Sequence, residues 1–140
     1  MGTFNVRKLM DKRKKARWKK RDYRVRMLHL EKKISPLEGA PQGKGLVLSK
    51  RQIEQKQPHS GMIKCVRIKL IKNGKEVTAH APKDKAITFI QEHDEVTIEE
   101  IGGSQGKSYG SLSGVRYRVC AVNGISLEML RKGKKQRATR

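Results

Sequence analysis

The clearest hydrophobic pattern begins after residue 45, where short apolar runs and alternating apolar and polar positions predict strands. The run 75–81 places small apolar side chains at every second position, which is typical of a sheet with one solvated face. Pro82 ends this run, and the apolar piece 86–90 predicts a turn of helix. We therefore expect five strands, at 46–53, 62–72, 75–81, 94–101 and 115–122.

Turn signals separate these strands and indicate how they connect. Asn73-Gly74 follows the second strand, and both residues tolerate the positive φ angles of a type I′ hairpin turn. Several short strands in one small domain favour a closed or nearly closed sheet, because closure removes exposed edges. The predicted fold class is mainly β: a five-stranded barrel of the oligonucleotide-binding (OB) type, with a long basic N-terminal helical extension and a short basic C-terminal tail.

The first part of the chain has a different pattern. No Gly or Pro lies between Thr3 and Ser35, so a helix is predicted over much of this segment. Its apolar residues do not form a continuous seam, and the adjacent cations at 12–15 repel one another. We expect this segment to become ordered on RNA; a solvated or disordered basic tail and a localisation tract are the alternatives.

Residues 35–45 form a linker by composition, and charge divides the chain into an arm (1–42), a barrel (43–128) and a tail (129–140). The whole chain has 34 Lys and Arg against 13 Asp and Glu, which gives a net charge of +21. So much like charge predicts a polyanionic partner, and nucleic acid fits best because phosphate binding releases counterions. An anionic membrane surface is the rival. No apolar run is long enough to span a bilayer, so cytosolic synthesis is expected.

Few residues suggest other chemistry. Cys65 and Cys120 have no second Cys or His at zinc-ligand spacing, so we interpret them as ordinary buried or half-buried residues and expect no metal. The acidic stretch 92–100 is interpreted as a solvated face turned away from RNA, or as one that meets a basic neighbour.

Only six aromatic residues occur, three of them in the arm. The barrel therefore lacks the stacking platform that single-strand binders use, and this favours folded RNA as the ligand.

Two loops have unusual composition. The glycine-rich run 102–108 falls one residue short of a P-loop and continues into a strand, but Lys107 and the backbone amides can still reach a phosphate. The run 56–61 is either a plain connector or a rigid loop that docks into folded RNA. A catalytic Ser-His pair is disfavoured because no carboxylate is evident to orient His59. We expect no enzymatic activity.

One family matches these residues. KQPHSGMIKCVRIKLIKNGKEVTAHAPKD, preceded by PQGKGLVLSK and followed by GVRYRV and LRKGKKQRATR, resembles the universal small-subunit ribosomal protein family S-twelve, called S-twenty-three in eukaryotes. The basic N-terminal helix, KQP and IKNGK look like the archaeal and eukaryotic branch. The resemblance implies an OB barrel in the small ribosomal subunit, an arm between rRNA helices, and two loops at the decoding centre. It implies a cytoplasmic location, with nucleolar assembly in a eukaryote.

The resemblance also implies site residues. The first decoding loop comprises Lys56, Gln57, Pro58, His59 and Ser60, with Pro58 a candidate for hydroxylation. The second decoding loop comprises Lys107, Ser111, Leu112, Ser113, Gly114 and Arg116. The expected rRNA-binding residues of the arm and tail are Arg7, Lys8, Lys12, Arg13, Lys14, Lys15, Arg17, Trp18, Lys19, Lys20, Arg21, Lys134, Lys135 and Arg137.

The departures from the family pattern fall on the same two loops. His59 replaces Asn, Gly61 replaces Ala, and Ile63 replaces Arg. The second loop reads Ser-Leu-Ser-Gly at 111–114 where the family has Asp-Ile/Leu-Pro-Gly, so modification of that Asp, known in bacterial members, is excluded.

The expected function is that of a structural constituent of the small ribosomal subunit, which binds rRNA and supports the decoding centre and translational accuracy. The expected partners are small-subunit rRNA, neighbouring small-subunit proteins, the nearby codon–anticodon helix of mRNA and tRNA, and elongation factors. No cofactor, membrane or small-molecule substrate is expected. The alternative is a free RNA-binding or chaperone protein with an OB fold that acts outside the ribosome.

Overall fold

The structure is a computed structural model, and it describes residues 5–103 and 106–137. The outermost residues of the predicted arm and tail, and Ser104 and Gln105 of the glycine-rich run, lie outside the described residues. The chain divides into two compact units, Met1–Gly39 and Ala40–Arg140, and each is described by itself.

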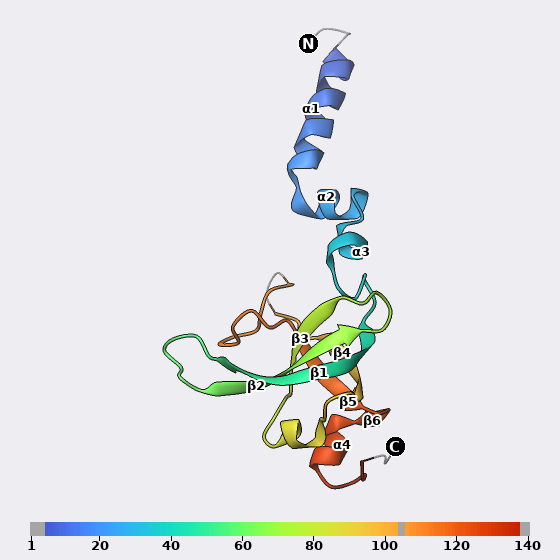
Figure 1. Ribbon diagram of the computed structural model, residues 1–140. Helices are drawn as coiled ribbons and strands as arrows, with labels where there is room; N and C mark the ends of the chain where they lie inside the picture. Colours follow the sequence, from blue (N-terminus) through green and yellow to red (C-terminus); the bar gives the residue numbers. More distant parts are fainter. Residues whose placement is uncertain (1–4, 104–105, 138–140) are drawn as a thin grey trace. The chain divides into compact units, whose positions relative to one another are not determined.

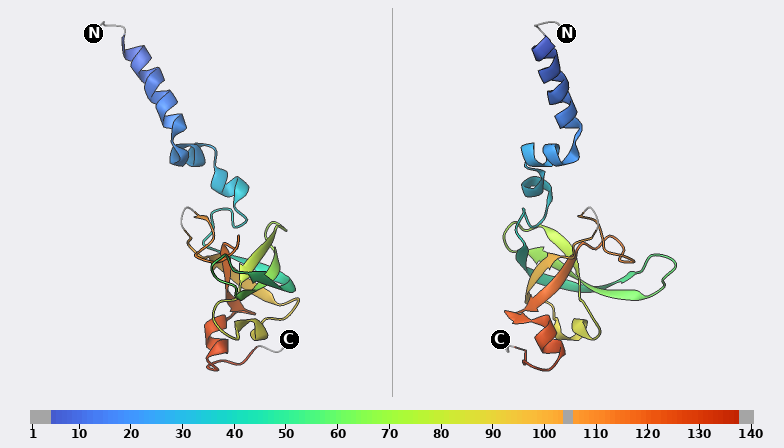
Figure 2. Two further views of the ribbon diagram at one scale, coloured as in Figure 1. Left: turned by 90° about the vertical axis from the view of Figure 1, so that its left-hand side faces the viewer. Right: turned by 180° about the vertical axis from the view of Figure 1, so that it is seen from behind.

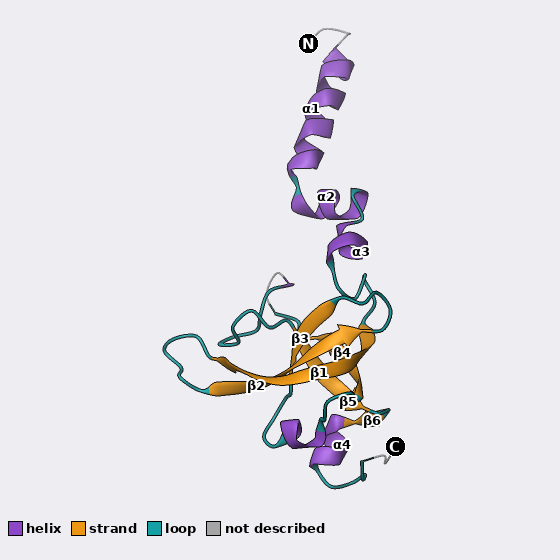
Figure 3. Ribbon diagram, viewed as in Figure 1, coloured by secondary structure: helices purple, strands orange, loops and turns teal. Residues whose placement is uncertain are grey.

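The described residues of the first unit form three helices, which Figure 3 draws in purple. They are α1 (Asn5–Lys19), α2 (Arg21–Met27) and α3 (Leu30–Ile34), and none of them buries a residue. Lys20 has an extended backbone and separates α1 from α2, whereas His29, with φ of 50°, separates α2 from α3. The predicted helical extension is confirmed, but it is broken into three helices rather than continuous.

The second unit is mainly β (Figure 1). Its strands are β1 (Gln42–Glu54), β2 (Met62–Leu70), β3 (Glu76–His80), β4 (Glu95–Glu100), β5 (Tyr117–Val122) and β6 (Ile125–Ser126). The short 3₁₀ helix η1 (Ala86–Phe89) precedes β4, and α4 (Leu127–Arg131) follows β6. The predicted turn of helix at 86–90 is confirmed. Neither β6 nor α4 was predicted, because both are too short to produce a periodic signal in the sequence.

The sheet curves until its first five strands form a closed ring, which can be followed in the views of Figure 2. The order is β3-β2-β1-β4-β5-β6 with antiparallel neighbours, and a short parallel pairing of β3 with β5 completes the ring. Gly45 of β1 pairs with both β2 and β4, and a Cβ there would lie 2.8 Å from the Lys69 carbonyl oxygen. A mainly β fold with a closed arrangement is therefore confirmed, whereas the OB type stays a prediction.

The core consists of small branched side chains on the inner face of the ring. Val66 and Ile68 of β2, Val96 and Ile98 of β4, and Val119 of β5 are fully buried. Burying each such side chain contributes about 1.5–3 kcal/mol relative to leaving it exposed. Because these positions alternate with exposed or half-buried ones, the core fixes the pairing register, since a slip by one residue would turn every apolar side chain outward.

The hairpin between β2 and β3 forms, but the predicted type I′ turn is wrong. Gly74 has a positive φ of 66°, whereas Asn73 does not belong to the left-handed residues. The Leu70 amide donates to the Lys75 carbonyl, so four residues form the loop instead of two. The buried pair Ile68 and Val77 sets this register, and the Asn73 side chain accepts a hydrogen bond from the Lys75 amide.

Candidate nucleic-acid interface

The first predicted decoding loop projects from the ring between β1 and β2 (Figure 1). All five of its predicted residues, 56–60, are exposed. At its base the Gln55 amide donates to the Gly61 carbonyl at 3.0 Å, and within it the His59 amide donates to the Lys56 carbonyl at 3.0 Å. These bonds hold the loop backbone, so its exposed side chains project from a defined base.

The second predicted decoding loop lies between β4 and β5 and is anchored by apolar side chains. Leu112 and Val115 are buried, while Lys107, Gly114 and Arg116 are exposed. The Ile101 amide donates to the Arg116 carbonyl at 2.9 Å and closes the loop base. As predicted, the glycine-rich run leads to a strand and not to the helix that a P-loop requires.

The structure brings the two loops together at Ser111. The Lys56 amide donates to the Ser111 carbonyl at 3.0 Å. The Gln55 side-chain amide donates to the Ser111 hydroxyl, also at 3.0 Å. Gln55 and Ser111 are 56 positions apart in the sequence. No local pattern could have indicated that they join the loops.

The predicted arm residues are displayed to solvent. Every residue from Val6 to Asp22 is exposed, including Trp18, which is 40 % exposed. The Trp18 and Tyr23 rings meet edge to face at 5.2 Å, and the Arg17 guanidinium lies 4.8 Å from the Tyr23 ring centre. Among the described residues, no salt bridge involves a side chain of α1, α2 or α3.

The tail residue Arg137 has a structural contact that the sequence did not predict. Its guanidinium binds both carboxylate oxygens of Asp94 at 2.7 and 2.8 Å. Asp94 is 3 % exposed, and it also accepts from the Gln91 backbone amide and the Asn123 side chain. Burial alone would raise the pKa of Asp94, but these hydrogen bonds and the Arg137 charge outweigh it and lower the pKa below its ordinary value. Lys134 and Lys135 are exposed.

The acidic stretch meets basic residues of the chain itself, which was one of the two predicted interpretations. Glu95 pairs with Lys44 at 3.0 Å, and Glu99 pairs with Arg118 at 2.7 Å. The other interpretation, a solvated face, is wrong for Asp94, which is buried.

A basic groove of about 320 Å³ lies on β1 and β2 beside η1. Lys50, Arg51 and Lys64 line it together with Gln52 and the η1 residues Ile87 and Thr88. Three of the six residues that line this groove are basic, and none of the described lining residues is acidic. Lys50-Arg51 on a predicted strand was a signal in the sequence, but Lys64 joins them only through strand pairing.

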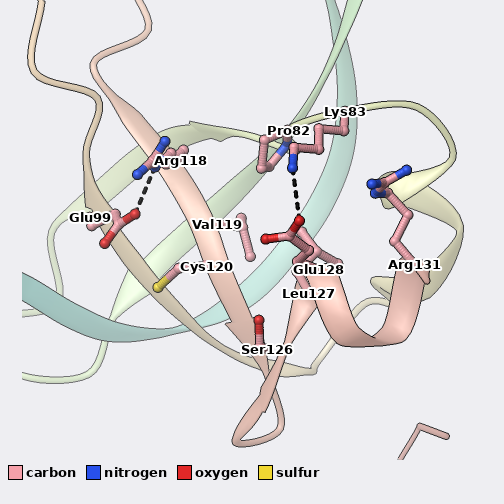
Figure 4. A pocket seen from close by; sticks show the side chains of 10 residues that line it. All are labelled: Pro82, Lys83, Glu99, Arg118, Val119, Cys120, Ser126, Leu127, Glu128 and Arg131. Carbon is pink, nitrogen blue, oxygen red and sulfur yellow. Dashed lines mark hydrogen bonds and ion pairs between the residues drawn. The ribbon is translucent and has the colours of Figure 1, made fainter. Parts of the chain in front are cut away.

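A second pocket, of about 210 Å³, lies among β4, β5 and α4 (Figure 4). Its charges are mostly paired: Lys83 points toward Glu128 at 3.0 Å, and Arg118 toward Glu99 at 2.7 Å. Hydrogen bonds from Lys132 and Lys83 lower the pKa of Glu128 to about 2. Because two of its cations, Lys83 and Arg118, are already paired with carboxylates, this pocket offers less free positive charge than the basic groove.

The cysteines fit the interpretation as ordinary residues. Both are free, and burial raises the pKa of the Cys65 thiol to about 11. The Cys120 thiol donates to the Thr97 carbonyl at 3.2 Å. Within residues 5–103 and 106–137, no three His, Cys, Asp or Glu side chains gather as metal ligands. None of the described helices has the length and apolar character needed to cross a bilayer.

A closed strand ring, two joined loops and a net charge of +21 define a class of small basic proteins that suits a large polyanionic partner. Comparison with protein families then gives the family. Residues 30–140, well over half of the chain, match the family Ribosomal protein S12/S23. The chain belongs to this family, which confirms the resemblance, and it is a small-subunit ribosomal protein of the translation machinery with rRNA and ribosomal proteins as partners. Helices α1 and α2 lie outside the matched residues.

Proposed function

We propose that this chain is a structural constituent of the small subunit that binds rRNA and supports the decoding centre, without catalytic activity. The observation that carries the proposal is the joining of the exposed first loop to the partly buried second loop at Ser111. Two loops held as one surface can recognise one arrangement of folded RNA better than another. A difference of about 1–3 kcal/mol between RNA states is enough to affect selection accuracy.

In this proposal the first loop contacts rRNA beside the codon–anticodon helix. Pro58, His59 and Ser60 are exposed at its tip, where they can buttress the closed, cognate form of the decoding site. Pro58 remains our candidate for hydroxylation. Elongation factors that approach this face are the proposed transient partners.

Phosphate neutralisation is assigned to the arm, to Lys134 and Lys135 of the tail, and to the basic groove. Each Lys or Arg that meets a phosphate releases counterions, so binding falls as salt rises. The arm therefore supplies affinity, while the two loops supply sensitivity to the state of the RNA. The proposed location is the cytoplasmic ribosome, with nucleolar assembly in a eukaryote.

Replacing Pro58 by Ala, or His59 by Ala, tests the decoding role. We expect each variant to enter small subunits normally and to change misreading in a translation assay, because each alters only the loop tip. Sucrose-gradient fractionation measures incorporation in the same cells. Normal incorporation with unchanged accuracy would contradict the decoding role, whereas a chain never recovered with small subunits would favour the free RNA-binding alternative.

A further inference from the structure

Gln55 contacts both loops although it lies just before the first of them. It is half-buried and follows directly after β1. Its backbone amide donates to the Gly61 carbonyl, which closes the first loop, and its side-chain amide donates to the Ser111 hydroxyl in the second, each at 3.0 Å. Gln55 therefore ties the base of the first loop to Ser111 of the second.

Gly61 leaves the space that the Gln55 side chain occupies. A Cβ at position 61 would lie 2.5 Å from Oε1 and 3.3 Å from Cδ of Gln55. Gly61 does not belong to the glycines with positive φ, so its backbone does not require glycine. The constraint is one of space: a Cβ at position 61 requires the end of the Gln55 side chain to shift from the position in which it donates to Ser111.

We propose that Gln55, Gly61 and Ser111 form an interlock in which Gln55 is a positioning residue that holds the two loops as one unit. Gln55 acts through the loops, and its own side chain is directed at Ser111 rather than at RNA. The Lys56 amide makes a second bond to the Ser111 carbonyl, so loss of Gln55 loosens the interlock without separating the loops entirely. The effect on accuracy rests on the proposed decoding function, whereas the interlock itself does not.

Hydrogen exchange at the Lys56 amide tests the interlock directly, since this amide donates to Ser111 across the junction. We expect Gln55→Ala and Gly61→Ala each to speed this exchange by about five- to tenfold, as loss of one hydrogen bond of ordinary strength would do. The double variant should exchange no faster than Gln55→Ala alone, because the added Cβ no longer meets an amide. Ser111→Ala should resemble Gln55→Ala, and Ser111→Thr, which keeps the hydroxyl, should retain most of the protection.

Gln91→Ala is the matched control, because Gln91 is exposed and its hydrogen bonds to Asp94 use backbone atoms of Gln91 alone. Exchange is measured in the free full-length chain and again in reconstituted small subunits, so that a variant which unfolds alone is still tested. Unchanged Lys56 exchange in Gly61→Ala, or additive effects in the double variant, would overturn the interlock.

Misreading by the same subunits separates the two proposals. We expect Gly61→Ala and Gln55→Ala to shift misreading in the same direction, with the double variant equal to Gln55→Ala. Faster exchange with unchanged misreading supports the interlock and contradicts the decoding role. Altered misreading with unchanged exchange overturns the interlock and leaves the decoding role standing.

Discussion

The helical arm and the strand ring are both basic, but they differ in whether their charged and apolar side chains find partners within the chain. In the second unit, Lys44 and Arg118 of the ring and Arg137 of the tail each pair with a carboxylate of the chain itself, and the apolar side chains fill a core. In α1, Leu9 and Met10 are 55 % and 66 % exposed, and no described residue of the helix is buried. The ring therefore contains the interactions that stabilise it, whereas the arm offers charges and apolar groups to a partner.

The two units therefore differ in the source of the free energy that stabilises their folded states. A helix of the length of α1 is marginal in water without tertiary packing, and like charges along it weaken it further. In the proposed function RNA supplies what the helix lacks, because phosphates would cancel the charge of the arm and the bound surface would cover its apolar groups. We accordingly expect the ring to fold without RNA and the arm to become ordered with it.

Removing the arm should produce the largest effect. A chain without residues 1–33 loses fourteen Lys and Arg, so we expect incorporation into small subunits to fall by at least about tenfold, with a shallower salt dependence of rRNA binding. The thermal unfolding of the ring should stay nearly unchanged. Gradient fractionation and calorimetry measure the two quantities, and a truncated chain that assembles as well as the full chain would contradict the role given to the arm.

A paired core and arm substitution sharpens the comparison. Ile98→Ala in β4 should lower the free energy of unfolding by about 2–5 kcal/mol, because the side chain is fully buried and leaves a cavity. Leu9→Ala in α1 should change it by less than about 0.5 kcal/mol, since the side chain is exposed. Denaturant unfolding of the free chain measures both. Equal losses would show that the arm packs as the ring does.

Arg137→Gln tests whether the ring uses its tail as an internal partner. We expect a loss of about 3 kcal/mol, because the buried Asp94 carboxylate then lacks its charged partner. Asp94 has a folded pKa below its ordinary 3.8, so its contribution is present above that pH and is lost as pH falls through the folded pKa. Without Arg137 the folded pKa rises, and the loss in acid should begin at higher pH. Stability measured from neutral pH down to about pH 3 tests this, with the exposed Lys135→Gln as control.

The strands and the arm could be predicted because their signals are local. Alternating apolar residues marked β3, and the absence of Gly and Pro marked the arm helices. The failures involve distant partners. The sequence places Asp94 in an acidic stretch that was interpreted as solvated, whereas in the structure Asp94 pairs with Arg137. Asn73-Gly74 predicted a two-residue turn, whereas the pairing of the core strands sets a longer loop.

The candidate site was predicted as two separate loops, and its junction was not. Gly61 and Ser111 were noted as departures from a family pattern, in different loops. Only the folded chain places both of them against Gln55. A hydrogen bond between residues so far apart in sequence leaves no periodic trace, so the junction could not be predicted from the sequence.

The most direct test of the account is amide hydrogen exchange across the whole chain, compared between the free protein and the assembled small subunit. The account predicts that β1 to β5 are protected in both states, while α1 and α2 gain protection only in the subunit. An arm that is fully protected in the free chain, with no gain on assembly, would contradict the claim that RNA completes its folding.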